Sequence, residues 1–327
     1  MELNMKKDLS YVCNYLKALV IPDMPDDFVV AEKFKHGLTE DEIRKGILAF
    51  RDFLYVLFDK LAADKDKIDV KTGSKYDIDG YIGDNGDGNI FKCFPSICDL
   101  GIILFSLGFH GILETSHENK LTVNSEDLFT VISPKSERWY SLVKMSDDRK
   151  LEMFHLLSDF GLRFDGADFL EEVDFSKVKQ FDIAYEKNNY FIVGLKMIAE
   201  AAANVKSPYI GLSGTFLRCD FYPLANEKPQ KQFVDINEFA NAQPPEVKEW
   251  IKDTDVFLTD NGCRREGTWE FTYFRPKAKS KVGMVCRIHM DIRGCFVTPG
   301  VNHLAKLDSM PLPDEIVNLM KAERKCG

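Results

Sequence analysis

The sequence predicts an α+β protein in two parts: a helix-rich N-terminal domain with short β-hairpins (1–183) and a C-terminal domain of helices packed on a small antiparallel sheet (184–327). Two patterns support this fold class. Apolar residues recur at helical spacing over 7–61, and they alternate with polar residues over 267–293. A chain of 327 residues is long for one hydrophobic core and suits two. Charged residues and asparagines gather at 180–187, which places the expected boundary there.

Two helices are predicted at the N-terminus. The first covers residues 7–20 and is followed by prolines that stop it. The second begins after Thr39, which forms a possible capping box with Glu42. Its apolar residues follow a heptad spacing: Ile43, Ile47, Phe50, Leu54, Leu57 and Leu61. The stripe leaves a coiled-coil dimer open, but its breadth favours packing against the first helix.

A buried helix followed by a hairpin is predicted over 97–124. Ser96 and Asp99 are expected to cap the helix and Gly108 to end it. Helix followed by hairpin is the order of winged-helix domains, so this segment is a third functional alternative, a nucleic-acid-binding unit. A related pattern follows later, which raises the question whether 104–124 and 156–180 form an internal repeat.

The second half of the chain is expected to contain a helix at 190–204, a strand at 215–222, a helix starting with proline near 245, and a helix at 311–325. The clearest sheet signal is a hairpin over 267–293. With Arg275 opposite Val282, the alternating apolar residues of both strands share one face. In that register Glu270 lies opposite Arg287, an opposite-charge pair that suits the solvent face.

Composition narrows the class of protein. The net charge of −9 and the pI near 5.3 argue against general binding to nucleic acid. The N-terminus does not resemble a signal peptide, and the most apolar stretch is too short and too polar for a membrane span. The eight cysteines form no C-x-x-C pair and are expected to be reduced. We therefore expect a soluble cytoplasmic protein without contact to membranes.

The stretch "IGDNGDGNI" at 82–90 resembles part of a calcium-binding loop. Aligning Gly88 with the sixth position of an EF-hand loop places Gly83 and Phe94 at the first and twelfth positions, where carboxylates are required. Aspartate, asparagine and glycine are also ordinary turn residues. The sequence thus favours a turn without metal, and leaves a non-standard site as a weak alternative, built from Asp77, Asp79, Asp84 and Asp87.

The strand "CRIHMDIRGC" carries the strongest candidate site. Alternation places four residues on one strand face: Arg287, His289, Asp291 and Arg293. This face suits an anionic ligand such as a nucleotide or phosphate, and His289 oriented by Asp291 is a candidate general base. Nearby Arg264 and Arg265 are further candidates for binding the anion. A mixed row of charges is also common on any exposed sheet.

A local basic excess surrounds this hairpin, with lysines 277, 279 and 281 near its tip. The segment 275–281 is the best local candidate for contact with nucleic acid. The sequence contains no P-loop, dinucleotide-binding, nucleophile-elbow or H-E-x-x-H motif. It therefore favours a non-catalytic interaction or regulatory protein that binds another protein and needs no cofactor. The alternative is an enzyme or anionic-ligand-binding protein that uses the Arg287–Arg293 face.

Overall fold

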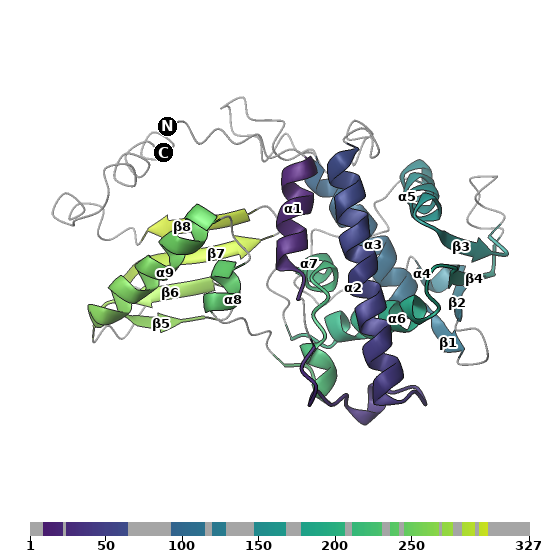
Figure 1. The fold of residues 1–327 in the computed structure, drawn as a ribbon, viewed down its shortest axis with the longest axis horizontal. Helices are drawn as coiled ribbons and strands as arrows, with labels where there is room; N and C mark the ends of the chain where they lie inside the picture. Colours follow the sequence, from purple (N-terminus) through teal and green to yellow (C-terminus); the bar gives the residue numbers. More distant parts are fainter. Residues whose placement is uncertain are drawn as a thin grey trace. The chain divides into compact units, whose positions relative to one another are not determined.

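The computed structural model divides into two units, and both contain helices and a four-stranded antiparallel sheet (Figure 1). Unit 1 comprises Met1–Phe233 with Asp291–Gly294, and unit 2 comprises Val234–Met290 with Cys295–Gly327. The α+β fold class is therefore confirmed. The residues that the structure describes are 9–21, 24–64, 93–114, 120–128, 147–167, 178–206, 211–230, 236–241, 245–267, 270–276, 283–291 and 294–299.

The first two helices of unit 1 lie where the sequence predicts them. α1 spans Leu9–Leu19 and α2 spans Glu40–Ala63. The Thr39 hydroxyl accepts a hydrogen bond from the Glu42 N–H, and the Glu42 carboxylate accepts one from the Thr39 N–H at 2.8 Å. The capping box is thus confirmed. Every residue of the predicted heptad stripe is buried within the chain, against α1 and α6, so the stripe belongs to the core.

α2 crosses α6, which spans Tyr190–Ala203, at a pair of glycines. A Cβ atom added to Gly194 would lie 2.0 Å from the carbonyl oxygen of Gly46, so the two backbones touch directly. Next to this contact, the Phe191 ring lies 5.8 Å from Phe50 and 4.7 Å from Phe53. Small residues at the crossing and aromatic rings around it fix the position of both helices.

α3 spans Cys93–His110 and corrects two predictions about its ends. Gly108 does not end the helix. It lies within it, where a Cβ would be 2.4 Å from the Leu195 carbonyl oxygen of α6. Asp99 does not cap the helix either. Its side chain is buried and forms an ion pair with Arg149 of α5 (Asp147–Asp159) at 3.1 Å. Both residues serve contacts between helices that local sequence does not reveal.

The four-stranded sheet of unit 1 has the order β1-β2-β4-β3. Its strands span Ile112–Glu114, Lys120–Asn124, Leu162–Asp165 and Gln180–Tyr185, numbered in chain order. α3 leads into the β1–β2 hairpin and α5 leads into the β3–β4 hairpin, and the two hairpins join through antiparallel β2 and β4. The helix–hairpin order predicted for 97–124 is confirmed. The same arrangement occurs twice, as the resemblance of the two segments suggests.

The expected domain boundary at 183/184 falls inside unit 1. It would cut β4, whose Ile183 pairs with Leu121 of β2, and would separate α6 from α2. The polar residues at 186–189 instead form the short turn between β4 and α6. The change between units occurs after Phe233.

The prediction of a strand at 215–222 is wrong. α7 spans Gly211–Leu217, and a 3-10 helix, η5, spans Tyr222–Ala225. Between them Cys219 has a left-handed backbone with φ 56°. Arg218 and Asp220 are both buried, 3.5 Å apart, so the apparent alternation of apolar and charged residues does not mark an exposed face.

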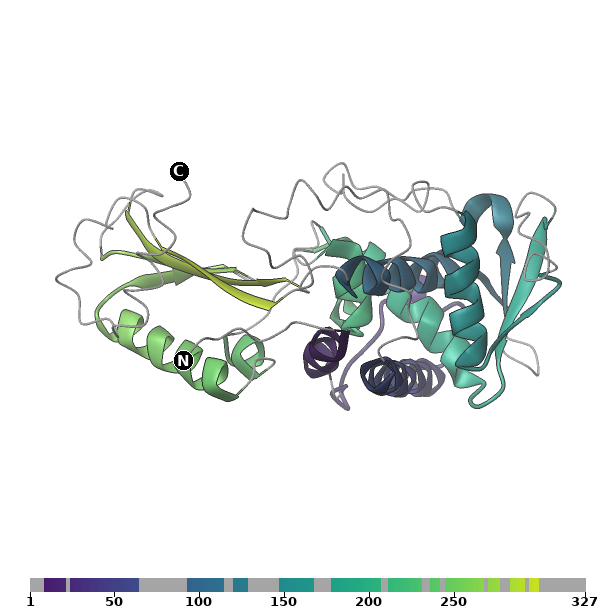
Figure 2. The ribbon, with the colours of Figure 1, turned by 90° about the horizontal axis from the view of Figure 1, so that it is seen from above.

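Unit 2 places two helices on one face of the sheet β5-β6-β7-β8 (Figure 2). The helices are α8 (Ile236–Asn241) and α9 (Pro245–Asp260), the latter with the predicted proline in its first turn. The strands span Arg264–Glu266, Glu270–Phe274, Met284–Asp291 and Gly294–Pro299. The predicted hairpin exists as β6 and β7, and the helix predicted at 311–325 lies outside the described residues.

The register of that hairpin differs from the prediction by two residues. Phe271 pairs with Ile288, Tyr273 with Cys286, and Glu270 with His289 instead of Arg287. A bulge follows Tyr273 and lengthens the β7 side of the connection. Because the shift is even, the inward face keeps its apolar residues, and Phe271, Tyr273 and Ile288 are buried.

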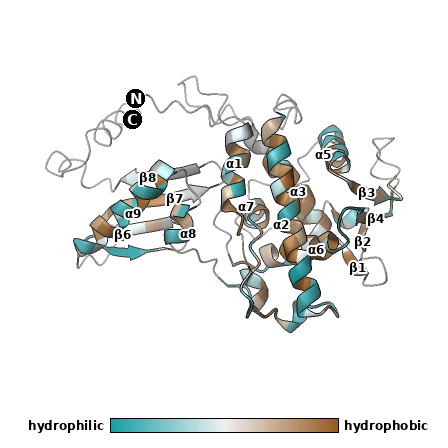
Figure 3. Cartoon of the chain, in the orientation of Figure 1, coloured by the Kyte–Doolittle hydropathy of each residue, from teal (hydrophilic) through white to brown (hydrophobic). Residues whose placement is uncertain are grey.

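Hydrophobic residues are concentrated in the inner helices of unit 1, notably α3 and α6 (Figure 3). Most of the described apolar side chains of both helices are buried in the core. In the described part of the chain, no helix has both the length and the apolar character of a membrane span.

Candidate functional site

The predicted strand face of unit 2 lies on β7. Arg287 pairs with Thr272 of β6, and His289 and Asp291 follow on the same strand. The side-chain positions of His289 and Asp291, and residue Arg293 as a whole, lie outside the described part of the structure. The anion site built from this row therefore stays a prediction. Of this predicted row, the described structure supports only that Arg287, His289 and Asp291 follow one another along β7.

The two arginines expected to assist this site already have partners. Arg264 forms an ion pair with Glu266 at 2.8 Å, and its guanidinium lies 5.3 Å from the Phe274 ring centroid. Arg265 forms an ion pair with Asp255 of α9 at 2.6 Å. Both contacts hold the guanidinium groups at the edge of unit 2. Binding of an anion by either arginine has to compete with these carboxylates.

Asp255 also accepts a hydrogen bond from the hydroxyl of Tyr273, at 2.8 Å. Burial, together with this hydrogen bond and the charge of Asp255, raises the pKa of Tyr273 above its ordinary value. The phenol therefore stays protonated and works as a donor. The Arg265–Asp255–Tyr273 network joins α9 to the sheet and explains why Arg265 is held in place.

The remaining predicted ligand sites lie mostly in undescribed segments. Asp77, Asp79, Asp84 and Asp87 are outside the described residues, as are lysines 277, 279 and 281 of the basic hairpin. Among the residues that are described, no three His, Cys, Asp or Glu side chains are grouped so as to hold a metal ion. Cys13 and Cys219 are buried, and burial raises the pKa of Cys286 to about 12, which disfavours the reactive thiolate.

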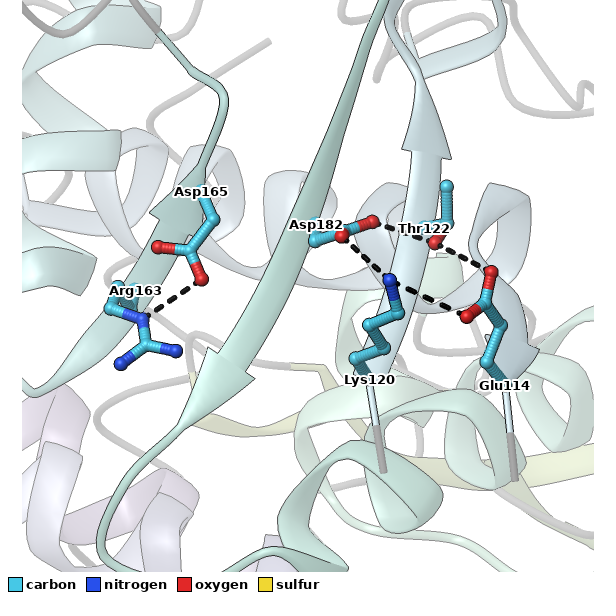
Figure 4. A network of polar contacts seen from close by, with 6 residues as sticks. All are labelled: Glu114, Lys120, Thr122, Arg163, Asp165 and Asp182. Atoms are coloured by element: carbon cyan, nitrogen blue, oxygen red, sulfur yellow. Dashed lines mark hydrogen bonds and ion pairs between the residues drawn. The ribbon is translucent and has the colours of Figure 1, made fainter. Parts of the chain in front are cut away.

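The outer face of the unit 1 sheet carries a network of charged side chains (Figure 4). The Lys120 ammonium lies 2.9 Å from Asp182 and 3.4 Å from Glu114, while the Thr122 hydroxyl donates to Asp182 at 2.7 Å. Burial alone would raise the pKa of Asp182, but hydrogen bonds from Lys120 and Thr122 outweigh it and lower the pKa. One ammonium lies between two carboxylates, so opposite charges pair across the strands, which is typical of a solvated sheet face.

This sheet also bears on the winged-helix alternative. A wing is a hairpin that is free to contact a groove of the nucleic acid. β2 pairs with β1 on one side and with β4 on the other, so the β1–β2 hairpin is built into a four-stranded sheet. The face that this hairpin exposes includes Glu114 beside Lys120, which does not favour phosphate binding.

A third polar cluster joins three parts of unit 1. His36 has a left-handed backbone with φ 49°, and its Nε2 lies 2.8 Å from the Glu200 carboxylate of α6. Lys196 contacts the same carboxylate at 3.1 Å and donates to the Phe109 carbonyl of α3 at 2.9 Å. A histidine beside a carboxylate has the chemistry of a general base. Here, however, Lys196 shares the carboxylate, and the chain of contacts ties the start of α2 to α6 and α3.

The loop at 24–31 combines rigidity with exposed apolar and acidic side chains. Arg44 of α2 donates to three consecutive carbonyl oxygens, those of Met24 (3.0 Å), Pro25 (2.7 Å) and Asp26 (3.1 Å). The Phe28 N–H donates to the Pro25 carbonyl at 3.1 Å and closes a turn around Asp26. A single guanidinium therefore holds the backbone of the turn in one conformation.

The second half of the loop is held by the elements beside it. The Val30 N–H donates to the Glu40 carboxylate at 3.3 Å, and the Ala31 N–H donates to the Leu224 carbonyl at 2.8 Å. The Phe28 ring packs edge-on against Phe221, with centroids 5.1 Å apart. Although its backbone is held on both sides, the loop leaves Val29 64% exposed.

Sequence reasoning missed this loop. The prolines around Met24 indicated only that the first helix ends, and no role was predicted for Arg44. The partners of Arg44 are carbonyl oxygens some twenty positions earlier, which no local pattern reveals.

Comparison of the chain with protein-family models, with curated proteins and with solved structures finds no match.

Proposed function

We propose that this protein is a non-catalytic interaction protein and that the 24–31 loop, with Tyr222 beside it, is its docking surface. The observation that carries the proposal is the fixed backbone of a loop whose side chains are exposed. Val29 is 64% exposed and Tyr222 is 45% exposed, while Arg44 holds the turn before them by three carbonyl contacts.

Rigidity matters because ordering a flexible loop reduces the affinity of any complex. Each side chain or loop segment that is immobilised on binding costs about 0.5–1.5 kcal/mol, and a preformed loop avoids much of that cost. Exposed apolar side chains on such a loop add favourable burial when a partner covers them. Scattered exposed apolar residues are normal on any protein. The 24–31 loop differs because a dedicated arginine holds the backbone that presents them.

The test is site-specific photo-crosslinking in cells that naturally produce the protein. A benzophenone amino acid replaces Val29 in one variant and Val56 in the control, since Val56 of α2 is also exposed, at 43%. We expect one discrete protein adduct from position 29 and none from position 56. The adduct should disappear when the unlabelled protein is overproduced in the same cells.

A further variant separates docking from accidental proximity. Arg44→Gln removes the guanidinium contacts and frees the turn, while α2 keeps its cap and its buried stripe. We expect this change to reduce the position-29 adduct strongly without changing the helix signal in circular dichroism. Equal adducts from positions 29 and 56, or no adduct from either, would reject the proposed function.

A further inference from the structure

We infer that the partner of this surface is a basic, apolar polypeptide segment, an inference that rests on the proposed docking function. The charges at the tip of the turn point to it. Asp26 and Asp27 are both exposed, and the Asp26 side chain is fully so. The Asp26 carboxylate forms an ion pair with Arg44 at 3.8 Å, a distance longer than a hydrogen bond because the arginine donates to carbonyl oxygens instead.

Other basic side chains near the loop are already engaged with their own partners. Lys33 contacts the side chain of Asn204 at 3.2 Å and the carbonyl oxygen of Glu227. Lys35 lies 3.0 Å from Glu32 and 3.3 Å from Glu40. Arg44 is one cation beside two exposed carboxylates, so the turn keeps a net negative charge, in a chain whose net charge is −9. Such a surface attracts cations and repels phosphates.

The apolar part of the surface selects a partner with hydrophobic side chains. Val29 offers an aliphatic contact, and the Tyr222 ring lies 6.1 Å from the Phe28 ring, which connects it to the loop. An exposed aromatic ring also attracts a lysine or arginine through its π face. A segment with both basic and apolar side chains satisfies the aspartates, the valine and the tyrosine together.

The backbone of the loop restricts the mode of binding. The carbonyl oxygens of residues 24–26 accept from Arg44, and the N–H groups of Val30 and Ala31 donate to Glu40 and Leu224. Pairing of an incoming strand requires free backbone groups. Because these groups are used within the chain, the loop favours recognition through side chains, and the affinity then depends on the partner's side-chain chemistry and charge.

The experiment measures the binding of three short fluorescent peptides to the full-length protein by fluorescence anisotropy. The first alternates Lys and Arg with Leu and Trp, the second replaces its basic residues by Glu, and the third replaces its apolar residues by Ser. We expect the first peptide to bind at least about tenfold more tightly than either of the others, a difference of about 1.4 kcal/mol.

Matched variants locate the binding. D26N/D27N should weaken binding of the first peptide about fivefold and reduce its dependence on salt, as expected for two exposed charges. The control D148N/E249Q removes the same number of exposed acids from α5 and α9 and should leave the affinity unchanged. Equal losses in both double variants would show attraction to net charge alone and would overturn the inference.

Two further outcomes also overturn it. One is equal or tighter binding of the acidic peptide, and the other is binding to phosphatidylserine vesicles that D26N/D27N does not weaken. If no peptide binds but the position-29 adduct forms, the docking function stands and the basic partner is rejected. If neither the peptides nor the crosslinker detects contact, both proposals fail.

Discussion

Replacing Gly194 by alanine tests the helix crossing on which unit 1 is built. The added Cβ atom would lie 2.0 Å from the Gly46 carbonyl oxygen, 2.6 Å from its carbonyl carbon and 2.7 Å from the Cβ of Phe50. A carbon atom approaches a carbonyl oxygen to about 3.3 Å, so α2 and α6 would have to separate by about 1.3 Å. The nearest atoms are backbone, and no side-chain rotation relieves the contact.

Two effects of opposite sign determine the magnitude. Overpacking a core costs about 1–3 kcal/mol, whereas alanine is favoured over glycine by about 1 kcal/mol in a helix interior. Because the clash involves backbone at the centre of a helix pair, the upper end of the cost applies. We expect a net loss of about 2 kcal/mol in the free energy of unfolding. For a unit of this size, that loss lowers the melting temperature by roughly 4–8 °C.

The assay is urea unfolding followed by the helix signal in circular dichroism. Gly46→Ala should cost less than Gly194→Ala, because the closest atom to its Cβ is the Val193 side chain at 2.7 Å. Gly37→Ala is the control for backbone strain without a clash: its φ is +79°, and nothing lies within 4 Å of the added Cβ. If Gly194→Ala is as stable as the wild type or more so, helix propensity dominates and the close crossing is refuted.

Three other predictions concern a cap, a buried ion pair and a tyrosine. Thr39→Ala should lower the free energy of unfolding by about 1 kcal/mol in the same assay, while Thr39→Ser, which keeps the hydroxyl, should restore most of it. Burial raises the pKa of Asp99 from 3.8 to about 6 despite Arg149. Protonation of the Asp99 carboxyl therefore stabilises the folded state. This stabilisation is complete below pH 3.8 and is lost as the pH rises through about 6. Urea unfolding at pH 4.5 and 7 measures the free energy of unfolding of Asp99→Asn and of the wild type. The variant should fall further below the wild type at pH 4.5 than at pH 7. The same difference at both pH values would contradict this. Tyr273→Phe removes the hydrogen bond to Asp255 and should lower the free energy of unfolding of unit 2 by about 1.5 kcal/mol. Unfolding is followed by tryptophan fluorescence, since α9 of unit 2 contains a tryptophan. An unchanged unfolding midpoint would refute this prediction.

The sequence predicted the features of the fold that neighbouring residues determine. The cap at Thr39 depends on two residues three positions apart, and the stripe of α2 depends on helical periodicity alone. The face of the β6–β7 hairpin was also predicted, because alternation fixes which residues point inward. Its register was wrong by two, since alternation is unchanged by an even shift.

Long-range contacts account for the other errors. Gly108 has the sequence context of a helix end, but it is needed where α3 touches α6. Arg218 and Asp220 looked like the exposed side of a strand, but they are buried beside each other. The candidate docking loop was missed for the same reason. The contact between Arg44 and three carbonyl oxygens exists only after α2 and the preceding chain have folded together.

The two acidic surfaces of unit 1 show why net charge alone does not locate a docking site. On the sheet, the Lys120 ammonium donates a hydrogen bond to Asp182 at 2.9 Å, so a cation already occupies this carboxylate. At the loop, Arg44 directs its donors to carbonyl oxygens, and the Asp26 carboxylate 3.8 Å away stays fully exposed. The same arginine thus fixes the backbone of the turn and leaves its carboxylate accessible. A partner's cation can approach that carboxylate without first displacing a hydrogen-bonded lysine, whereas on the sheet it has to break the Lys120 contact.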